Sequence, residues 1–184
     1  MKLILSKIKT YFGKLDKLLL FMCIGIAFFA VFIQYTLYEN DISSAVTASQ
    51  YKTQIIAFIA GIVIAMALAA INYKYLAKLW FIYVPLAMGL TLLLFTPLGI
   101  KREGADDIGW LDLGIMTIQP SEILKLAFIL SLAFHLSKVE DRMNEPIHFI
   151  LLCIHGAIPT LLIRQTGDDG SALVFLFILS LIHI

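Results

Sequence analysis

Two charged residues, Glu122 and Lys125, stand in an otherwise apolar stretch that begins at Pro120. Proline is favoured in the first turn of a helix, so a helix is predicted to start here, with Glu122 near the positive end of its dipole. Side chains three residues apart share a helix face, and a lysine inside a membrane-crossing helix is costly to expose to lipid. The pair is therefore expected either to line a polar cavity or to form a local ion pair that reaches the outer interface.

The stretch that leads into this helix, residues 101–119, is polar and rich in glycine. Gly104, Gly109 and Gly114 allow the backbone to turn. Trp110 suits a membrane interface, where an indole ring can lie half in water. The stretch is interpreted as an outer loop that positions the charged pair.

Two further groups of polar residues could carry chemistry. The cluster RQTGDDG at residues 164–170 places Asp168 and Asp169 beside glycines, a composition typical of a turn, although carboxylate oxygens can also hold a cation. His135 and His155 lie in apolar stretches. They are interpreted as interhelical hydrogen-bond partners rather than as metal ligands.

Composition sets the class of protein that must position these residues. Of 184 residues, 60% are hydrophobic and 15% are charged, and the net charge is +1. The mean hydropathy is +0.92. A soluble domain has roughly 45–50% apolar and about 25% charged residues. The sequence has no basic stripe of the kind that nucleic acid requires, so no nucleic-acid partner is expected.

Apolar runs long enough to cross a membrane recur along the chain. They predict an all-α fold, a polytopic transmembrane helix bundle with five full spans and the start of a sixth. The spans are Leu18–Leu37, Gln54–Ile71, Leu79–Leu98, Pro120–Leu136 and Ile147–Ile163, and the sixth begins at Ser171 and reaches Ile184.

The distribution of lysine and arginine predicts the orientation. If the N-terminus is cytoplasmic, nine basic residues lie inside and four lie in the outer loops, which agrees with the positive-inside rule. The chain is divided into a basic cytoplasmic segment, residues 1–17, and a transmembrane part, residues 18–184. The inner residues are Lys2, Lys7, Lys9, Lys14, Lys17, Lys74, Lys78, Lys138 and Arg142, and the outer ones are Lys52, Lys101, Arg102 and Arg164.

The stretch WLDLGIMTIQPSEILKLA resembles the signature of the SEDS family, the RodA, FtsW and SpoVE proteins of bacterial cell-wall synthesis. The arginine that the family places directly before the tryptophan is replaced by Gly109, and Lys101 or Arg102 is expected to supply the positive charge instead. The matching residues are Trp110, Leu111, Leu113, Gly114, Gln119, Pro120, Ser121, Glu122 and Lys125, with Asp168, Gly170 and Ser171 fitting a second family motif.

The resemblance implies a peptidoglycan glycosyltransferase that polymerises lipid II at the outer face of the bacterial cytoplasmic membrane. It implies a class B penicillin-binding protein (a transpeptidase) and membrane lipids as partners. A divalent cation, Mg²⁺ or Mn²⁺, is compatible with the family, but no cofactor is evident in the residues. The candidates for the substrate cavity are Glu122, Lys125, Asp168, Gln119, Ser121, Arg102 and Trp110.

The family has about ten spans, and its catalytic aspartate lies in a later outer loop that has no counterpart here. The chain is therefore expected to be an N-terminal fragment without a catalytic residue and inactive alone, and its last residues, LSLIHI, need not be native. Two alternatives stay open for the whole protein: a flippase or transporter of the lipid-linked precursor, and a non-catalytic scaffold for a transpeptidase. Elongation, division and sporulation types are not separated.

Overall fold

The computed structural model describes residue 13 and residues 16–40, 47–102, 104–114, 117–143 and 145–180. Most of the predicted basic segment, residues 1–17, lies outside this part of the chain, as do residues 181–184. The chain divides into two compact units, Met1–Asn72 and Tyr73–Ile184. The division predicted from the sequence, at residue 17, stays a prediction.

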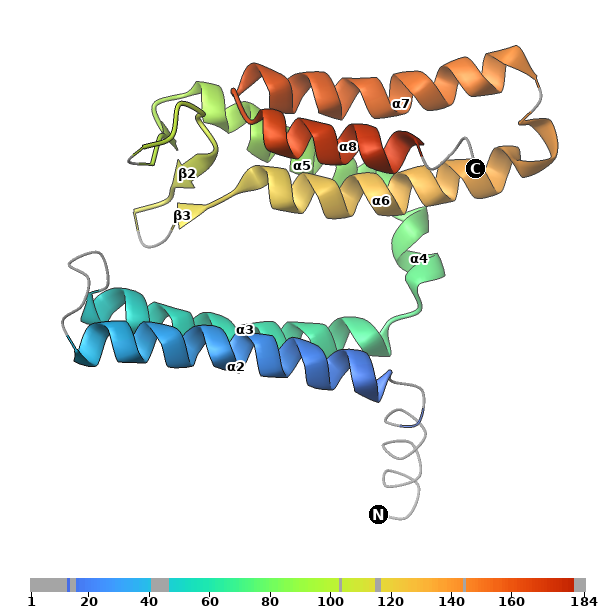
Figure 1. Ribbon diagram of the computed structural model, residues 1–184. Helices are drawn as coiled ribbons and strands as arrows, with labels where there is room; N and C mark the ends of the chain where they lie inside the picture. Colours follow the sequence, from blue (N-terminus) through green and yellow to red (C-terminus); the bar gives the residue numbers. More distant parts are fainter. Residues whose placement is uncertain are drawn as a thin grey trace. The chain divides into compact units, whose positions relative to one another are not determined.

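The first unit is a hairpin of two long helices, α2 (Lys17–Glu39) and α3 (Ala48–Ala70), which lie side by side (Figure 1). Asp16 caps α2, because its carboxylate accepts the Leu19 N–H at 3.0 Å. Thr47 and Gln50 form a reciprocal capping box that begins α3. Neither helix has a buried residue. Apolar helices with outward-facing side chains and internally satisfied backbones are suited to lipid.

The second unit packs helices around one small core and ends in a short sheet. Its elements are α4 (Tyr73–Lys78), α5 (Trp80–Leu92), the 3-10 helix η1 (Leu93–Phe95), β1 (Gly99–Ile100), β2 (Trp110–Asp112), β3 (Thr117–Ile118), α6 (Pro120–Val139), the 3-10 helix η2 (Glu140–Arg142), α7 (Pro146–Gln165) and α8 (Asp169–Ser180).

Helix α6 supplies the centre of this core. Leu124, Phe128 and Leu132 recur every fourth residue and are almost completely buried. They pack with residues of the neighbouring helices, among them Ile163 of α7 and Phe175 of α8. The rings of Phe128 and Phe175 lie 5.2 Å apart between centroids. The core thus packs α6, the helix that carries Glu122 and Lys125, against α7 and α8.

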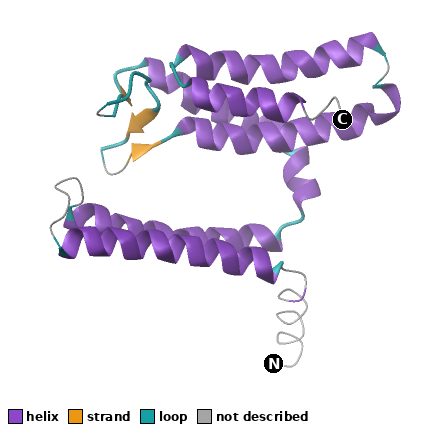
Figure 2. Cartoon of the chain, in the orientation of Figure 1, coloured by secondary structure: helices purple, strands orange, loops and turns teal. Residues whose placement is uncertain are grey.

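The sheet occupies the loop between η1 and α6 (Figure 2). Both pairings are antiparallel, with Ile100 opposite Trp110 and Leu111 opposite Ile118. The Asp112 carboxylate accepts a hydrogen bond from the Gly114 N–H at 2.7 Å, and Gly114 has a φ of 78°. The hydrogen bond and this backbone conformation, which glycine adopts readily, together form the turn after β2. The sequence predicted a loop here. The strands add to the all-α fold without changing its class.

The helices support a multi-pass membrane protein. By length and apolarity, α2, α3 and α7 can each cross a membrane, whereas α8 and Trp80–Phe95 are shorter apolar helices. The predicted third span runs to Leu98, whereas the helical residues end with η1 at Phe95. Pro97 lacks an N–H and disfavours helical geometry at Thr96. The count of five full crossings stays a prediction.

Candidate functional site

The candidate site is built around the first turn of α6. Gln119 precedes the helix in an extended conformation, and its side chain makes no capping hydrogen bond. Ser121 is 2% exposed, and within the described residues its buried hydroxyl has no hydrogen-bond partner. Four backbone N–H groups at a helix start lack intrahelical partners. At α6, however, Pro120 has no N–H and the Glu122 N–H donates to the Gln119 carbonyl at 3.2 Å, so the unpaired Ser121 hydroxyl is the distinctive polar group of this turn.

Glu122 and Lys125 form the ion pair that their spacing predicts. The Lys125 Nζ lies 2.6 Å from the Glu122 Oε1, and the side chains are 19% and 60% exposed, respectively. The lysine is thus largely covered, while the carboxylate stays accessible. The geometry confirms that both charges share one helix face, and their opening into a common cavity stays a prediction.

Trp110 of β2 carries a cation over its ring. The Arg102 guanidinium lies 3.4 Å from the ring centroid, at the distance of a close cation–π contact. Gly109 is buried, and a β-carbon there would lie 2.5 Å from Asp107 Oδ2 and 3.9 Å from Gln119 Nε2. Of the two residues expected to replace the missing family arginine, Arg102 is the one placed beside the tryptophan.

The two outer loops are joined to each other. The Ile108 N–H donates to the Thr166 carbonyl at 2.8 Å. Gly167, with a φ of 86°, lies so close to Asp107 that a β-carbon would come within 3.2 Å of its Cα. These contacts bring the second cluster to the same end of the unit as the sheet and the start of α6.

One carboxylate oxygen of Asp168 accepts a hydrogen bond, and the other has no partner among the described residues. Its Oδ1 accepts the Ser171 N–H at 2.8 Å and so caps the start of α8, as the turn interpretation requires. Its Oδ2 is buried and has no partner among the described residues. In that part of the chain no three His, Cys, Asp or Glu side chains group into a metal site. The divalent cation implied by the resemblance stays an expectation.

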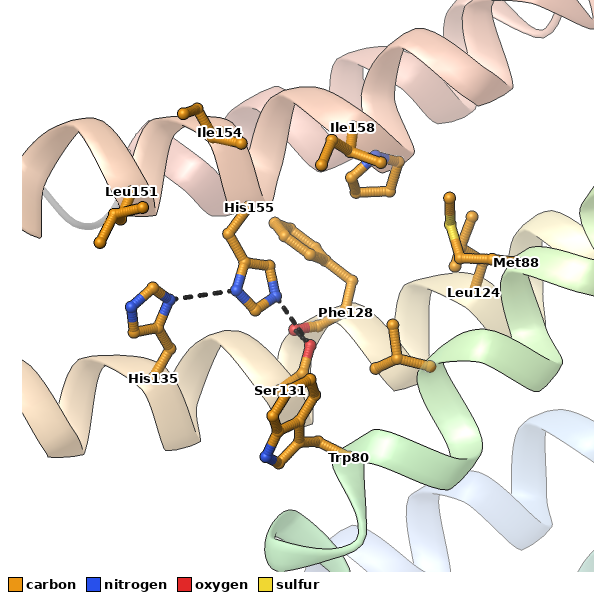
Figure 3. A pocket seen from close by; sticks show the side chains of 12 residues that line it. Trp80, Met88, Leu124, Phe128, Ser131, His135, Leu151, Ile154, His155 and Ile158 are labelled. Atoms are coloured by element: carbon orange, nitrogen blue, oxygen red, sulfur yellow. Dashed lines mark hydrogen bonds between the residues drawn. The ribbon is translucent and has the colours of Figure 1, made fainter.

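The two histidines form a hydrogen-bonded pair deeper in the unit (Figure 3). His135 Nδ1 and His155 Nδ1 lie 3.1 Å apart, and His155 Nε2 lies 3.0 Å from the Ser131 hydroxyl. The prediction of interhelical hydrogen bonds is therefore confirmed. Sequence reasoning missed Ser131 and Trp80 at this place, although the helical spacing of Ser131 and His135 could have suggested the serine.

The fold and this site define a class: a polytopic helical membrane protein with a folded polar loop before a charged helix start. The chain belongs to the FtsW/RodA/SpoVE family, whose sequence model, described as "Cell cycle protein", matches residues 14–184.

Relatives and solved structures agree with this assignment. The chain is 29% identical over 174 residues to a probable peptidoglycan glycosyltransferase FtsW of Trichlorobacter lovleyi, covering 86% of this chain and 42% of the relative. It is 28% identical over 170 residues to the protein of the same name from Methylomonas methanica, covering 89% and 43%. The chain thus spans less than half the length of these relatives.

Two solved structures share the fold. One comes from a peptidoglycan synthase complex described as coordinating polymerization and crosslinking, with a TM-score of 0.66, 23% identity, and coverage of 86% of this chain and 44% of the other. The second is the rod shape determining protein RodA of Thermus thermophilus, with a TM-score of 0.61, 24% identity, and coverage of 82% and 49%.

Proposed function

We propose that the full-length protein is a peptidoglycan glycosyltransferase that polymerises lipid II at the outer face of the cytoplasmic membrane. The observation that carries the proposal is the Lys125 ammonium, largely covered and held 2.6 Å from Glu122 at the start of α6. In this reaction a sugar hydroxyl attacks an anomeric carbon, and a lipid pyrophosphate leaves. A fixed cation stabilises the charge that develops on the leaving group. The names of the relatives support the same activity.

The other candidate residues take supporting roles in the proposal. Lys125 faces the pyrophosphate, and Glu122 fixes the position of the lysine. Arg102, stacked on Trp110, adds positive charge at the rim. Gln119 and the Ser121 hydroxyl offer polar contacts, and Asp168 organises the loop junction or takes part in binding a divalent ion. The base that takes the proton from the attacking hydroxyl belongs to the part of the protein outside this chain.

Polymer formation separates this proposal from its alternatives. Full-length protein, purified together with its class B penicillin-binding protein, is expected to convert lipid II into glycan strands that a gel resolves. Heat-denatured protein is the control. Movement of lipid II across the vesicle membrane without polymer formation would instead favour a flippase. Absence of both activities in correctly folded protein would favour a scaffold.

The orientation gives a separate prediction. With the N-terminus cytoplasmic, residue 106 lies outside and residue 142 lies inside, by the positive-inside rule. Cys23 and Cys153 are free thiols and are first replaced by serine. In intact cells an impermeant thiol reagent is expected to label Asp106→Cys and to leave Arg142→Cys unlabelled until the cells are opened. The reverse pattern would overturn the topology.

A further inference from the structure

A groove lies between α5, α6 and α7 (Figure 3). It consists of two cavities of about 340 and about 260 Å³. Both cavities are lined by Trp80, Ser131, His135 and His155, so they adjoin each other. His135 is fifteen residues from the start of α6, which places it roughly 22 Å along that helix from Pro120. The part of the groove that contains His135 and Lys138 therefore lies toward the end of the unit opposite the sheet, while the larger cavity extends back to Leu124.

Hydrogen bonds fix one wall of this groove. The Ser131 hydroxyl lies 3.1 Å from the Phe128 carbonyl, which can only accept, so the serine proton points there. Ser131 Oγ then accepts from His155 Nε2–H, and His155 Nδ1 accepts from His135 Nδ1–H. This order leaves Nε2 of a neutral His135 as an acceptor, on the side of the ring turned away from His155 (Figure 3).

The mouth of the groove carries donors. Lys138, in the last turn of α6, lines the smaller cavity together with Trp80. Its ammonium lies 5.6 Å from the centre of the Phe134 ring. Within the described residues Lys138 makes no ion pair, and the Trp80 indole N–H has no hydrogen-bond partner. A cation and an indole donor thus stand beside an imidazole acceptor.

The other end of the groove is apolar. The larger cavity extends from the histidines to Val84, Met88, Leu124 and Ile158. The groove therefore changes along its length from cationic and hydrogen-bonding to purely apolar. A free phosphate ion would match only the first part, whereas a lipid matches both.

From this arrangement we propose that the groove binds an anionic glycerophospholipid of the phosphatidylglycerol kind. The lipid phosphate meets the Lys138 ammonium and the Trp80 indole N–H, and a headgroup hydroxyl donates to His135 Nε2. One acyl chain lies along Val84, Met88 and Ile158. Charge complementarity at the mouth selects an anionic lipid over a zwitterionic one. The headgroup end of this site is separate from the lipid II site of the proposed function, and the proposal does not depend on that function.

Trp80 provides the readout. Full-length protein is placed in nanodiscs that contain lipids brominated on the acyl chain, and fluorescence that depends on Trp80 is taken as wild type minus Trp80→Phe. Half-quenching is expected at a severalfold lower mole fraction of brominated phosphatidylglycerol than of brominated phosphatidylcholine. Lys138→Gln should raise the mole fraction of brominated phosphatidylglycerol at half-quenching about fivefold. This factor corresponds to the binding free energy of one lysine near a membrane surface.

Lys78→Gln is the matched control, because Lys78 lies next to the groove in sequence but points at Tyr75, 6.0 Å from its ring. It should change the half-quenching fraction less than twofold, which separates the groove from general attraction to anionic lipid. Equal quenching by both lipids, or equal effects of the two lysine variants, would overturn the proposal and would fit a groove filled by the rest of the protein. Relief of quenching by inorganic phosphate would also overturn it, in favour of a free-anion site.

Discussion

Lys125→Ala is expected to abolish lipid II polymerisation by the full-length protein while leaving membrane insertion and folding intact. The Lys125 side chain is 19% exposed, in surroundings of lower effective dielectric than water, where a fixed cation interacts strongly with a pyrophosphate. The leaving group gains negative charge as it departs, so the attraction grows toward the transition state, which is the condition for raising the rate. Loss of one such group typically costs about 10²–10³ in rate.

The same ion pair explains why the variant should still fold. Removing one partner of a buried pair is destabilising because the other charge is left in the interior. Glu122, however, is 60% exposed and can be hydrated once the lysine is gone. The rate of polymer formation is measured on protein whose gel-filtration profile and thermal unfolding match those of the wild type.

Three variants test the assigned roles. Glu122→Gln should reduce the rate less than Lys125→Ala, since it only loosens the lysine. Lys125→Arg need not restore the rate, because a planar guanidinium does not replace a compact ammonium. Lys78→Ala, a lysine change at the other end of the unit, should leave polymerisation unaltered. A near-wild-type rate for folded Lys125→Ala would refute the role and leave a local ion pair that reaches the interface.

The helices could be predicted well from the sequence, and their ends less well. The start of α6 at Pro120 was placed correctly, because proline marks a first helical turn. Helix α3, however, begins at Ala48, six residues before the predicted span at Gln54. The predicted span followed the apolar run, whereas the helix begins at the Thr47–Gln50 capping box, which polar residues form. A membrane span and the helix that contains it need not have the same ends.

The site could be predicted only where it is local. Glu122 and Lys125 meet because helix geometry fixes residues three apart. The hydrogen bond between Ile108 and Thr166 joins segments that are remote in sequence, and no periodic pattern of residues predicts it. The sheet also escaped prediction, since its strands have two or three residues each, too few for an alternating pattern. The pairing of His135 with His155 likewise depends on how α6 and α7 pack.

This remote contact leads to the second large effect, at Gly167. Gly167→Ala is expected to lower both the stability and the polymerisation rate of the full-length protein. At a φ of 86° an alanine is strained, and its β-carbon would lie 3.2 Å from the Asp107 Cα, a backbone atom that cannot rotate aside. The strain costs about 1–2 kcal/mol. Crowding against the other loop adds roughly 1–3 kcal/mol.

Gly104→Ala is the matched control. Its φ of 78° imposes nearly the same backbone strain, yet nothing lies within 4 Å of a β-carbon there. Thermal unfolding should therefore show that the backbone strain lowers the stability of both variants. Only Gly167→Ala should also lose the contact between the loops. Because a misplacement of about 1 Å can cost roughly 10² in rate, polymerisation is expected to fall by about that factor in Gly167→Ala and to stay within about twofold in Gly104→Ala. Equal losses in the two variants would mean that the junction of the loops does not position the site, and that Asp168 serves only to begin α8.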